Sequence, residues 1–131
     1  MKKLLSLTIF IMLSVITFAQ ATTLFISEIA EGSSNNKYIE IYNGTGADID
    51  LSNYSLSRCT NGCNTFGEFD YPDAVTFPLG TMIMDGGTYI IAHASSDPII
   101  IAVTNQTYSS LSNGDDVYAL TVAGATASNY T

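Results

Sequence analysis

The sequence predicts an all-β domain built as a sandwich or a barrel, and three observations carry this prediction. β-Branched and aromatic residues occur in short runs that Gly, Asn, Asp and Ser interrupt, the pattern of short strands joined by turns. In the mature part of the chain no segment keeps an apolar period of 3.6 residues over the length of a helix. Once a leader of 19 residues is set aside, 112 of the 131 residues remain, close to the about 100 residues of an immunoglobulin-type sandwich.

The leader, residues 1–19, has the three parts of a secretory signal. Met1–Lys3 gives a positive start, Leu4–Ile16 is almost entirely apolar, and Thr17–Ala19 offers small residues for a signal peptidase. The apolar run is shorter than the about 20 residues of a membrane span. We therefore expect a cleaved signal peptide and a secreted or cell-surface domain over residues 20–131, with no membrane span in the mature chain. An uncleaved anchor or a buried helix is the alternative.

Four strands are expected in the first half of the mature chain. The first ends at the turn cluster 32–36, which is rich in Ser and Asn. The second alternates strictly, so Ile39 and Ile41 share one face, which we expect to be buried. The third is a short extended stretch, and the fourth leads into a turn that carries both cysteines. In order, these strands are Leu24–Ala30, Tyr38–Tyr42, Ile49–Leu51 and Tyr54–Arg58.

Five further strands are expected in the second half. The first stops at Pro78, because proline cannot donate to a strand ladder. The second is short and ends at the turn 85–87, and the third is strongly apolar and is expected at the centre of a sheet. Pro98 fixes the start of the fourth, and the fifth follows the turn 113–116. In order, they are Ala74–Phe77, Met82–Met84, Tyr89–Ala94, Ile99–Val103 and Val117–Val122.

Tyrosines lie at strand spacing within these runs. Because this spacing places them on the pleated faces, we expect Tyr38, Tyr42, Tyr89 and Tyr118 to cover the sheets. A glycan-binding platform of tyrosines is the alternative.

Acidic side chains dominate the mature chain. Its basic residues are Lys37 and Arg58, against twelve Asp and Glu, so its net charge is 2 − 12 = −10. Affinity for nucleic acid comes mainly from Lys and Arg that displace counterions from phosphates. We therefore expect no direct binding of nucleic acid. The same acidity favours solubility and leaves room for divalent cations.

Cys59 and Cys63 lie on either side of Asn61-Gly62, a strong tight-turn pair. Since export places them where disulfides persist, we expect a local disulfide, which the chain-entropy argument values at about 2 kcal/mol. A zinc site needs four ligands, and the chain offers these two cysteines and one histidine, His93. A redox pair is disfavoured because the spacing is not Cys-x-x-Cys.

Six pieces of the mature chain follow one another in the order of a known family. They are Ile26-Ser-Glu-Ile29, Lys37-Tyr-Ile-Glu-Ile-Tyr-Asn43, Ile49-Asp-Leu-Ser-Asn-Tyr-Ser-Leu56, Phe77-Pro-Leu-Gly-Thr81, Gly86-Gly-Thr-Tyr-Ile-Ile-Ala92 and Leu111-Ser-Asn-Gly-Asp-Asp116. Together they resemble the lamin tail domain family, in its bacterial exported type, from about Leu24 to Leu120. The resemblance implies an immunoglobulin-like β-sandwich that binds or attaches, with no catalytic residues to carry over.

The resemblance also implies a setting. Bacterial domains of this type occur in exported and surface proteins, often beside nucleases, phosphoesterases or other hydrolases. The chain departs from the family pattern in two ways: it ends where the family usually adds one more strand, and its cysteine pair is not a family hallmark. We expect the natural protein to continue past Thr131.

Acidic residues are the candidates for a ligand site. Glu28 and Glu40 lie inside strand runs, where we expect them to be solvated or hydrogen-bonded to nearby backbone, with ligand binding as the alternative. Calcium takes six to eight oxygen ligands, often from loops, although the EF-hand spacing is absent. The calcium candidates are Glu68, Asp70, Asp73, Asp115 and Asp116.

No catalytic site is expected. A serine nucleophile needs a base within hydrogen-bond reach, and although Asp97 follows His93 by four residues, no Gly-x-Ser-x-Gly elbow is present. A glycosidase would need two carboxylates at a fixed separation across a cleft, and we expect a domain of this size to be too small to frame one.

These observations lead to one main expectation. The chain is expected to be a non-catalytic binding or attachment module of an exported or cell-surface bacterial protein, with a protein, glycan or surface ligand and no cofactor. The alternatives are an accessory domain of a secreted hydrolase and a calcium-dependent adhesion module.

Overall fold

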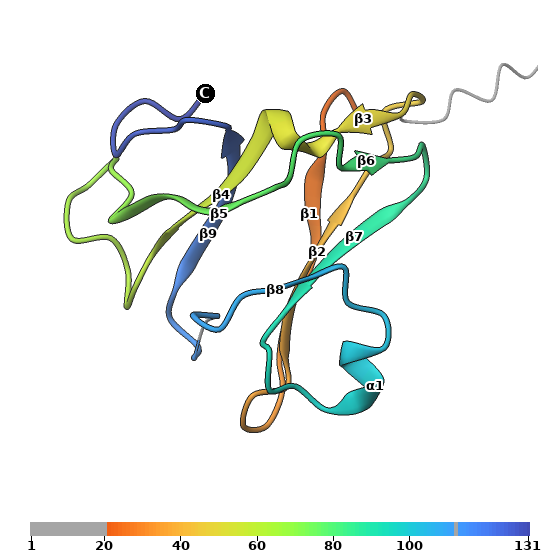
Figure 1. The fold of residues 1–131 in the computed structure, drawn as a ribbon. Coiled ribbons are helices and arrows are strands. Elements are labelled where there is room, and N and C mark those ends of the chain that lie inside the picture. Colours follow the sequence, from red (N-terminus) through yellow and green to blue (C-terminus); the bar gives the residue numbers. More distant parts are fainter. Residues whose placement is uncertain (1–20, 112) are drawn as a thin grey trace, which may run out of the picture.

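Nine strands and two short helical segments form the described part of the chain, residues 21–111 and 113–131 of a computed structural model (Figure 1). The signal peptide expected over residues 1–19 lies outside the described residues. Within the described ranges, no helix has the length and apolar character that a membrane crossing would require. In chain order the elements are β1 (Phe25–Glu31), β2 (Lys37–Tyr42), β3 (Ile49–Asp50), the 3₁₀ turn η1 (Leu51–Asn53), β4 (Tyr54–Cys59), β5 (Tyr71–Thr76), β6 (Met82–Ile83), β7 (Thr88–Ala92), α1 (Pro98–Ile101), β8 (Gln106–Thr107) and β9 (Val117–Val122).

Two main sheets form an immunoglobulin-like β-sandwich. One has the order β1-β2-β7-β8 and the other β5-β4-β9, and a β3-β6 pair lies at one end (Figure 1). The pairs β1–β2, β2–β7, β4–β5 and β4–β9 are antiparallel, whereas β7–β8 is parallel. The predicted central position of the 89–94 run is confirmed, since β7 pairs with β2 on one side and β8 on the other.

The core lies between the two sheets. Ile39 and Ile41 are 1% and 0% exposed, which confirms the predicted buried face of β2. Leu56 of β4 is fully buried opposite them, and the rings of Phe77 and Tyr89 meet edge to face at 5.4 Å. Because burying one aliphatic side chain stabilises a fold by about 1.5–3 kcal/mol, this alternation fixes which face of each sheet turns inward.

Strand β1 contains one extra residue, Ser27. Ile26 pairs with Ile41 and Glu28 pairs with Glu40, so the register shifts by one residue at Ser27. Without this β-bulge, alternation would place Glu28 on the same face as Ile26, toward the core. The bulge instead places Glu28 on the outer face, beside Glu40.

The predicted strand Ile99–Val103 is wrong. The chain forms one helical turn there, α1, and the strand that pairs with β7 is the later Gln106–Thr107. Asp97 Oδ1 accepts a hydrogen bond from Ile99 N at 3.1 Å, and Pro98 occupies the first turn of the helix. This cap and the fixed φ of proline initiate a helix, and they outweigh the β preference of three consecutive isoleucines.

The predicted disulfide between Cys59 and Cys63 is present, with Cα atoms 4.8 Å apart. Asn61 and Gly62 have φ of 54° and 81°. Two consecutive residues with positive φ are what a type I′ turn requires, so the Asn-Gly pair brings the two cysteines together.

Asn43 joins the end of β2 to the β3–β6 pair. Its side chain is fully buried, and its Nδ2 donates to the carbonyl oxygens of Ala47 and Ile83 at 2.8 and 2.9 Å. Its Oδ1 accepts from Thr45 N at 3.1 Å. All of these bonds satisfy a buried amide, which would otherwise cost the fold about 1–3 kcal/mol.

Candidate functional site

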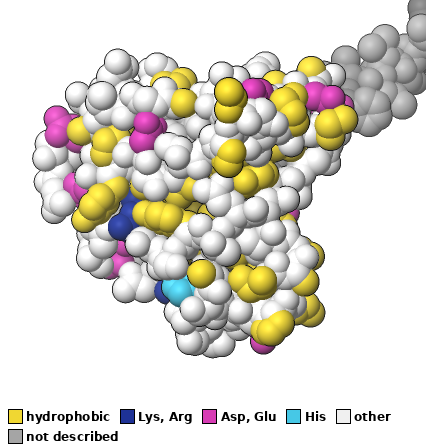
Figure 2. Space-filling view, viewed as in Figure 1, with side chains coloured by type: hydrophobic (Ala, Val, Ile, Leu, Met, Phe, Trp, Pro, Cys, Tyr) yellow, Lys and Arg dark blue, Asp and Glu magenta, His cyan; other side chains and the backbone are white. Residues whose placement is uncertain are grey.

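A groove of about 230 Å³ lies between α1 and the outer face of the four-stranded sheet. Figure 1 shows α1 on the side of β7 that faces away from the three-stranded sheet, and hydrophobic side chains gather at the surface over α1 (Figure 2). We call this feature the α1 groove. Its lining residues are Glu28, Tyr38, Glu40, Ile90, Ile99, Ile100 and Val103.

The floor of the α1 groove comes from three adjacent strands. Glu28, Glu40 and Ile90 form one cross-strand row, because Glu40 pairs with Glu28 on one side and with Ile90 on the other. The neighbours Ile39, Ile41 and Ile91 point into the core, so this row points outward. Glu28 and Glu40 therefore project from directly opposite positions of neighbouring strands on the outer face of the sheet.

Hydroxyl groups hold both carboxylates. The Tyr38 hydroxyl donates to Glu28 Oε1 at 2.8 Å, and Ser27 Oγ donates to Glu40 Oε1 at 2.7 Å. The bond to Glu28, more than burial, raises the pKa of Tyr38 above its usual value, because ionisation would break the bond and place a second negative charge beside the carboxylate. A carboxylate has about four acceptor positions, so each glutamate keeps acceptor capacity for a ligand.

The wall of the α1 groove is anchored at both ends. Before the helix, Asp97 N donates to Asn36 Oδ1 at 2.7 Å, which ties the helix start to the β1–β2 loop. After the helix, Asn105 makes two hydrogen bonds with the backbone of Ile90. Its N donates to the Ile90 carbonyl at 2.9 Å, and its Oδ1 accepts from Ile90 N at 2.7 Å. Ile99 is therefore held in place although it is 75% exposed.

The α1 groove has acceptors on its floor and aliphatic side chains on its wall. Pockets for small-molecule ligands commonly span about 300–1,000 Å³, and this groove, at about 230 Å³, is smaller. Its size suits one side chain of a partner better than a whole cofactor. The aliphatic wall was missed in the sequence, although Asp97-Pro98 before an apolar run is a helix-start signal that could have revealed it.

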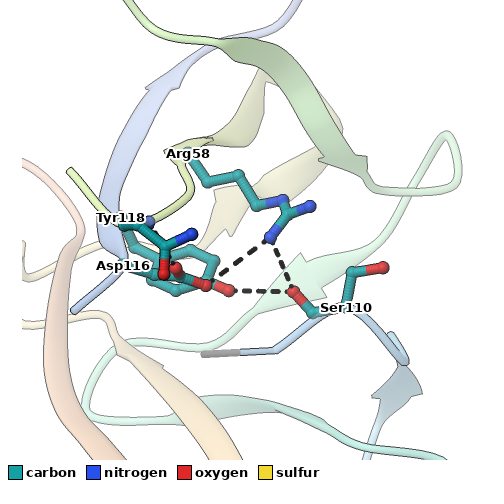
Figure 3. Close-up of polar contacts among 5 residues, drawn as sticks. Arg58, Ser110, Asp116 and Tyr118 are labelled. Carbon is teal, nitrogen blue, oxygen red and sulfur yellow. Dashed lines mark hydrogen bonds and ion pairs between the residues drawn. The ribbon is translucent and has the colours of Figure 1, made fainter. Parts of the chain in front are cut away.

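A second polar cluster surrounds Arg58 in β4 (Figure 3). Its Nη1 donates to the Ser110 carbonyl at 3.1 Å and lies 3.6 Å from Asp116 Oδ2. The Tyr118 hydroxyl donates to the same carbonyl at 3.0 Å. Burial raises the pKa of Tyr118, and the hydrogen bond with Arg58 acts in the opposite direction.

The charged groups of this cluster pair with each other and are largely buried. The Arg58 and Asp116 side chains are only 12% and 3% exposed, and the guanidinium lies 4.6 Å from the centre of the Tyr71 ring and 5.9 Å from that of Tyr108. Stacked and ion-paired in this way, Arg58 fastens the segment before β9 to the three-stranded sheet. The cluster is structural, because its two charged groups pair with each other in a largely buried position, although Arg58 Nε has no hydrogen-bond partner among the described residues.

The calcium candidates do not converge. Asp73 accepts from the backbone of Gly124 and Ala125 at 2.8 and 3.1 Å and from the Ser55 hydroxyl. Asp116 is paired with Arg58. Within the described residues, no three His, Cys, Asp or Glu side chains are placed to hold a metal ion. Binding of calcium by Glu68, Asp70, Asp73, Asp115 or Asp116 stays an untested prediction.

The residues of a hypothetical serine triad are used elsewhere. His93 Nδ1 accepts from Ser95 N at 3.0 Å, and the Asp97 carboxylate caps α1. Ser55 and Ser57 are fully buried, where their hydroxyls bond to Thr121 at 2.9 and 2.8 Å. These groups satisfy backbone and neighbouring hydroxyls, so each has a structural role.

Comparison with known families agrees with this architecture. The family model described as Lamin Tail Domain matches residues 17–131. No curated protein and no solved structure matches the chain. The match covers most of the chain and the whole described sandwich, and the chain therefore belongs to the lamin tail domain family.

Proposed function

We propose that this protein is a non-catalytic binding or attachment module of an exported protein and that the α1 groove is its contact surface. Membership in an immunoglobulin-like domain family supports a binding role, since such sandwiches present sheet faces and loops to partners on a rigid scaffold. The leader-like residues 1–19 support export.

One observation carries the proposal. The α1 groove combines two carboxylates with aliphatic side chains that the fold leaves exposed, Ile99 at 75% and Val103 at 60%. Single exposed apolar residues are ordinary, but apolar walls around a few convergent polar groups are typical of a ligand site. The anchoring of α1 at Asn36 and Asn105 keeps this arrangement preformed.

Binding of the purified protein to a panel of extracellular proteins, cell-surface glycans and intact cells tests the proposal. Ile99→Glu places a charge on the wall of the groove, and Leu79→Glu changes an apolar residue outside it that is even more exposed, 94% against 75% for Ile99. We expect Ile99→Glu to abolish binding and Leu79→Glu to retain it, with both variants as stable as the parent in thermal unfolding. Equal binding by both variants would contradict the role of the groove.

A further inference from the structure

We infer that the α1 groove receives a basic side chain, Lys or Arg, from a protein partner, with an aliphatic residue of the same segment packed against the wall. This inference rests on the proposed binding function and specifies the chemistry of the occupant.

The charges of the floor select a cation. Residues directly opposite each other on neighbouring strands have Cβ atoms about 4.5–5.5 Å apart, and like charges there destabilise the sheet. Glu28 and Glu40 are such a pair. A cation placed between them relieves this repulsion and adds charge-assisted hydrogen bonds.

The hydrogen-bond pattern selects a donor. The Tyr38 hydroxyl already gives its proton to Glu28 Oε1, so its oxygen offers only acceptor positions to a ligand. The polar atoms that Tyr38, Glu28 and Glu40 offer are thus all acceptors. An ammonium or guanidinium group carries donors only and matches this set, whereas a phosphate or carboxylate would meet repulsion.

The wall and the volume select a side chain. Lys and Arg pack their methylene stems along apolar surfaces while the charged head reaches polar groups. Ile99 and Val103 of the wall provide that apolar surface, together with Ile90, which lies beside Glu40 in the floor. The groove volume of about 230 Å³ suits one such side chain.

The net charge acts over a longer range. The mature chain carries two basic against twelve acidic residues. Such a surface attracts cationic partners and speeds their encounter at low ionic strength. A basic segment is therefore drawn to the molecule before the groove makes its specific contacts.

The experiment uses a matched pair of peptides, acetyl-Gly-Leu-Arg-Leu-Gly-amide and the same peptide with citrulline, which keeps the shape of arginine without its charge. Binding to the purified protein is followed by NMR shift titration at about 0.05 and 0.5 M NaCl. We expect the arginine peptide to bind at least about tenfold more tightly than the citrulline peptide, with shifts at Glu40, Ile90 and Ile99 and weaker binding at high salt.

Variants of one charge complete the test. Glu40→Gln is expected to weaken the arginine peptide about tenfold or more, whereas Glu68→Gln, an exposed glutamate outside the groove, changes it less than about twofold. Three results would overturn the inference. The two peptides could bind equally well, Glu40→Gln could bind the arginine peptide as well as the parent does, or a neutral glycan could occupy the groove with an affinity that Glu40→Gln does not change. If one of these results is found and Ile99→Glu still abolishes binding to the panel, the inferred basic side chain is wrong but the proposed function stands. If Ile99→Glu leaves binding to the panel intact, the proposed function fails as well.

Discussion

Single residues decide which chemistry the outer sheet face presents. Ser27 is the clearest case, because its bulge moves Glu28 from the inward to the outward face of β1 and its hydroxyl then holds Glu40. Glu28 and Glu40 were expected to be solvated or hydrogen-bonded to nearby backbone. In the structure their donors are instead side-chain hydroxyls, and an apolar wall lies beside them.

At the same scale, the ionisation of Tyr118 is expected to make the stability of the folded state fall as the pH rises in the alkaline range. Burial raises its pKa above the usual value of about 10, so the folded state keeps this proton to higher pH than the unfolded chain. The stability gained from neutral Tyr118 is complete below about pH 10 and is lost as the pH rises through the raised folded pKa. We expect the urea midpoint of Tyr118→Phe to fall less steeply than that of the parent between about pH 9 and 11.

A measurement at pH 7 serves as the control for this variant. There both forms of residue 118 are neutral, and the difference reports the lost hydrogen bonds of this hydroxyl, to the Ser110 carbonyl and with Arg58, about 0.5–1.5 kcal/mol for each. Parallel pH profiles of Tyr118→Phe and the parent would show that the burial of this hydroxyl has no linkage to folding.

At the scale of elements, α1 depends on its cap more than on its side chains. Its isoleucines favour strands, yet Asp97 and Pro98 start a helical turn whose next amides, Ile100 N and Ala102 N, bond to the Asp97 and Pro98 carbonyls at 2.9 Å each. One turn is too short to be stable alone, so the cap and the anchors at Asn36 and Asn105 maintain it.

Asp97→Ala is therefore expected to loosen the α1 segment. Loss of a cap costs about 0.5–2 kcal/mol, and we expect faster amide exchange at Ile100 and Ala102, with exchange at Ile41 and Ile91 unchanged. Asp97→Asn keeps a capping oxygen and is the matched control, since Asn and Asp cap about equally well. Unchanged exchange at Ile100 in Asp97→Ala would show that the anchors alone hold the helix.

The sequence predicted elements well where a turn signal marked a boundary or where alternation was clear. Val117–Val122 was predicted with the bounds that the structure has, and the burial of Ile39 and Ile41 followed from period-two patterning alone. The α1 segment was mistaken for a strand because propensity and capping conflict there. No residue type in β1 signals the bulge at Ser27, so only the pairing of β1 with β2 reveals it. The site was for this reason predicted only as two unexplained glutamates.

At the scale of the whole molecule, the leader and the acidic surface belong to one proposal, that of an exported binding module. If residues 1–19 are a cleaved signal, the secreted protein begins at Gln20. The intact mass of the protein recovered from the culture medium or the periplasm tests this. Leu13→Arg interrupts the apolar run and is expected to retain the precursor inside the cell. A secreted product that keeps Met1 would contradict cleavage.

The burial of Asn43 has a consequence for producing the protein. Asn43-Gly44-Thr45 is an acceptor sequence for N-linked sugars, and a eukaryotic secretory host would meet it on the nascent, unfolded chain. The amide that would carry the sugar is fully enclosed and gives both of its hydrogens to the Ala47 and Ile83 carbonyls. A chain glycosylated at Asn43 has no room for the sugar in the native packing, so in such a host the molecules modified at this residue misfold and only those left unmodified there reach the native fold, a division that bacterial expression avoids.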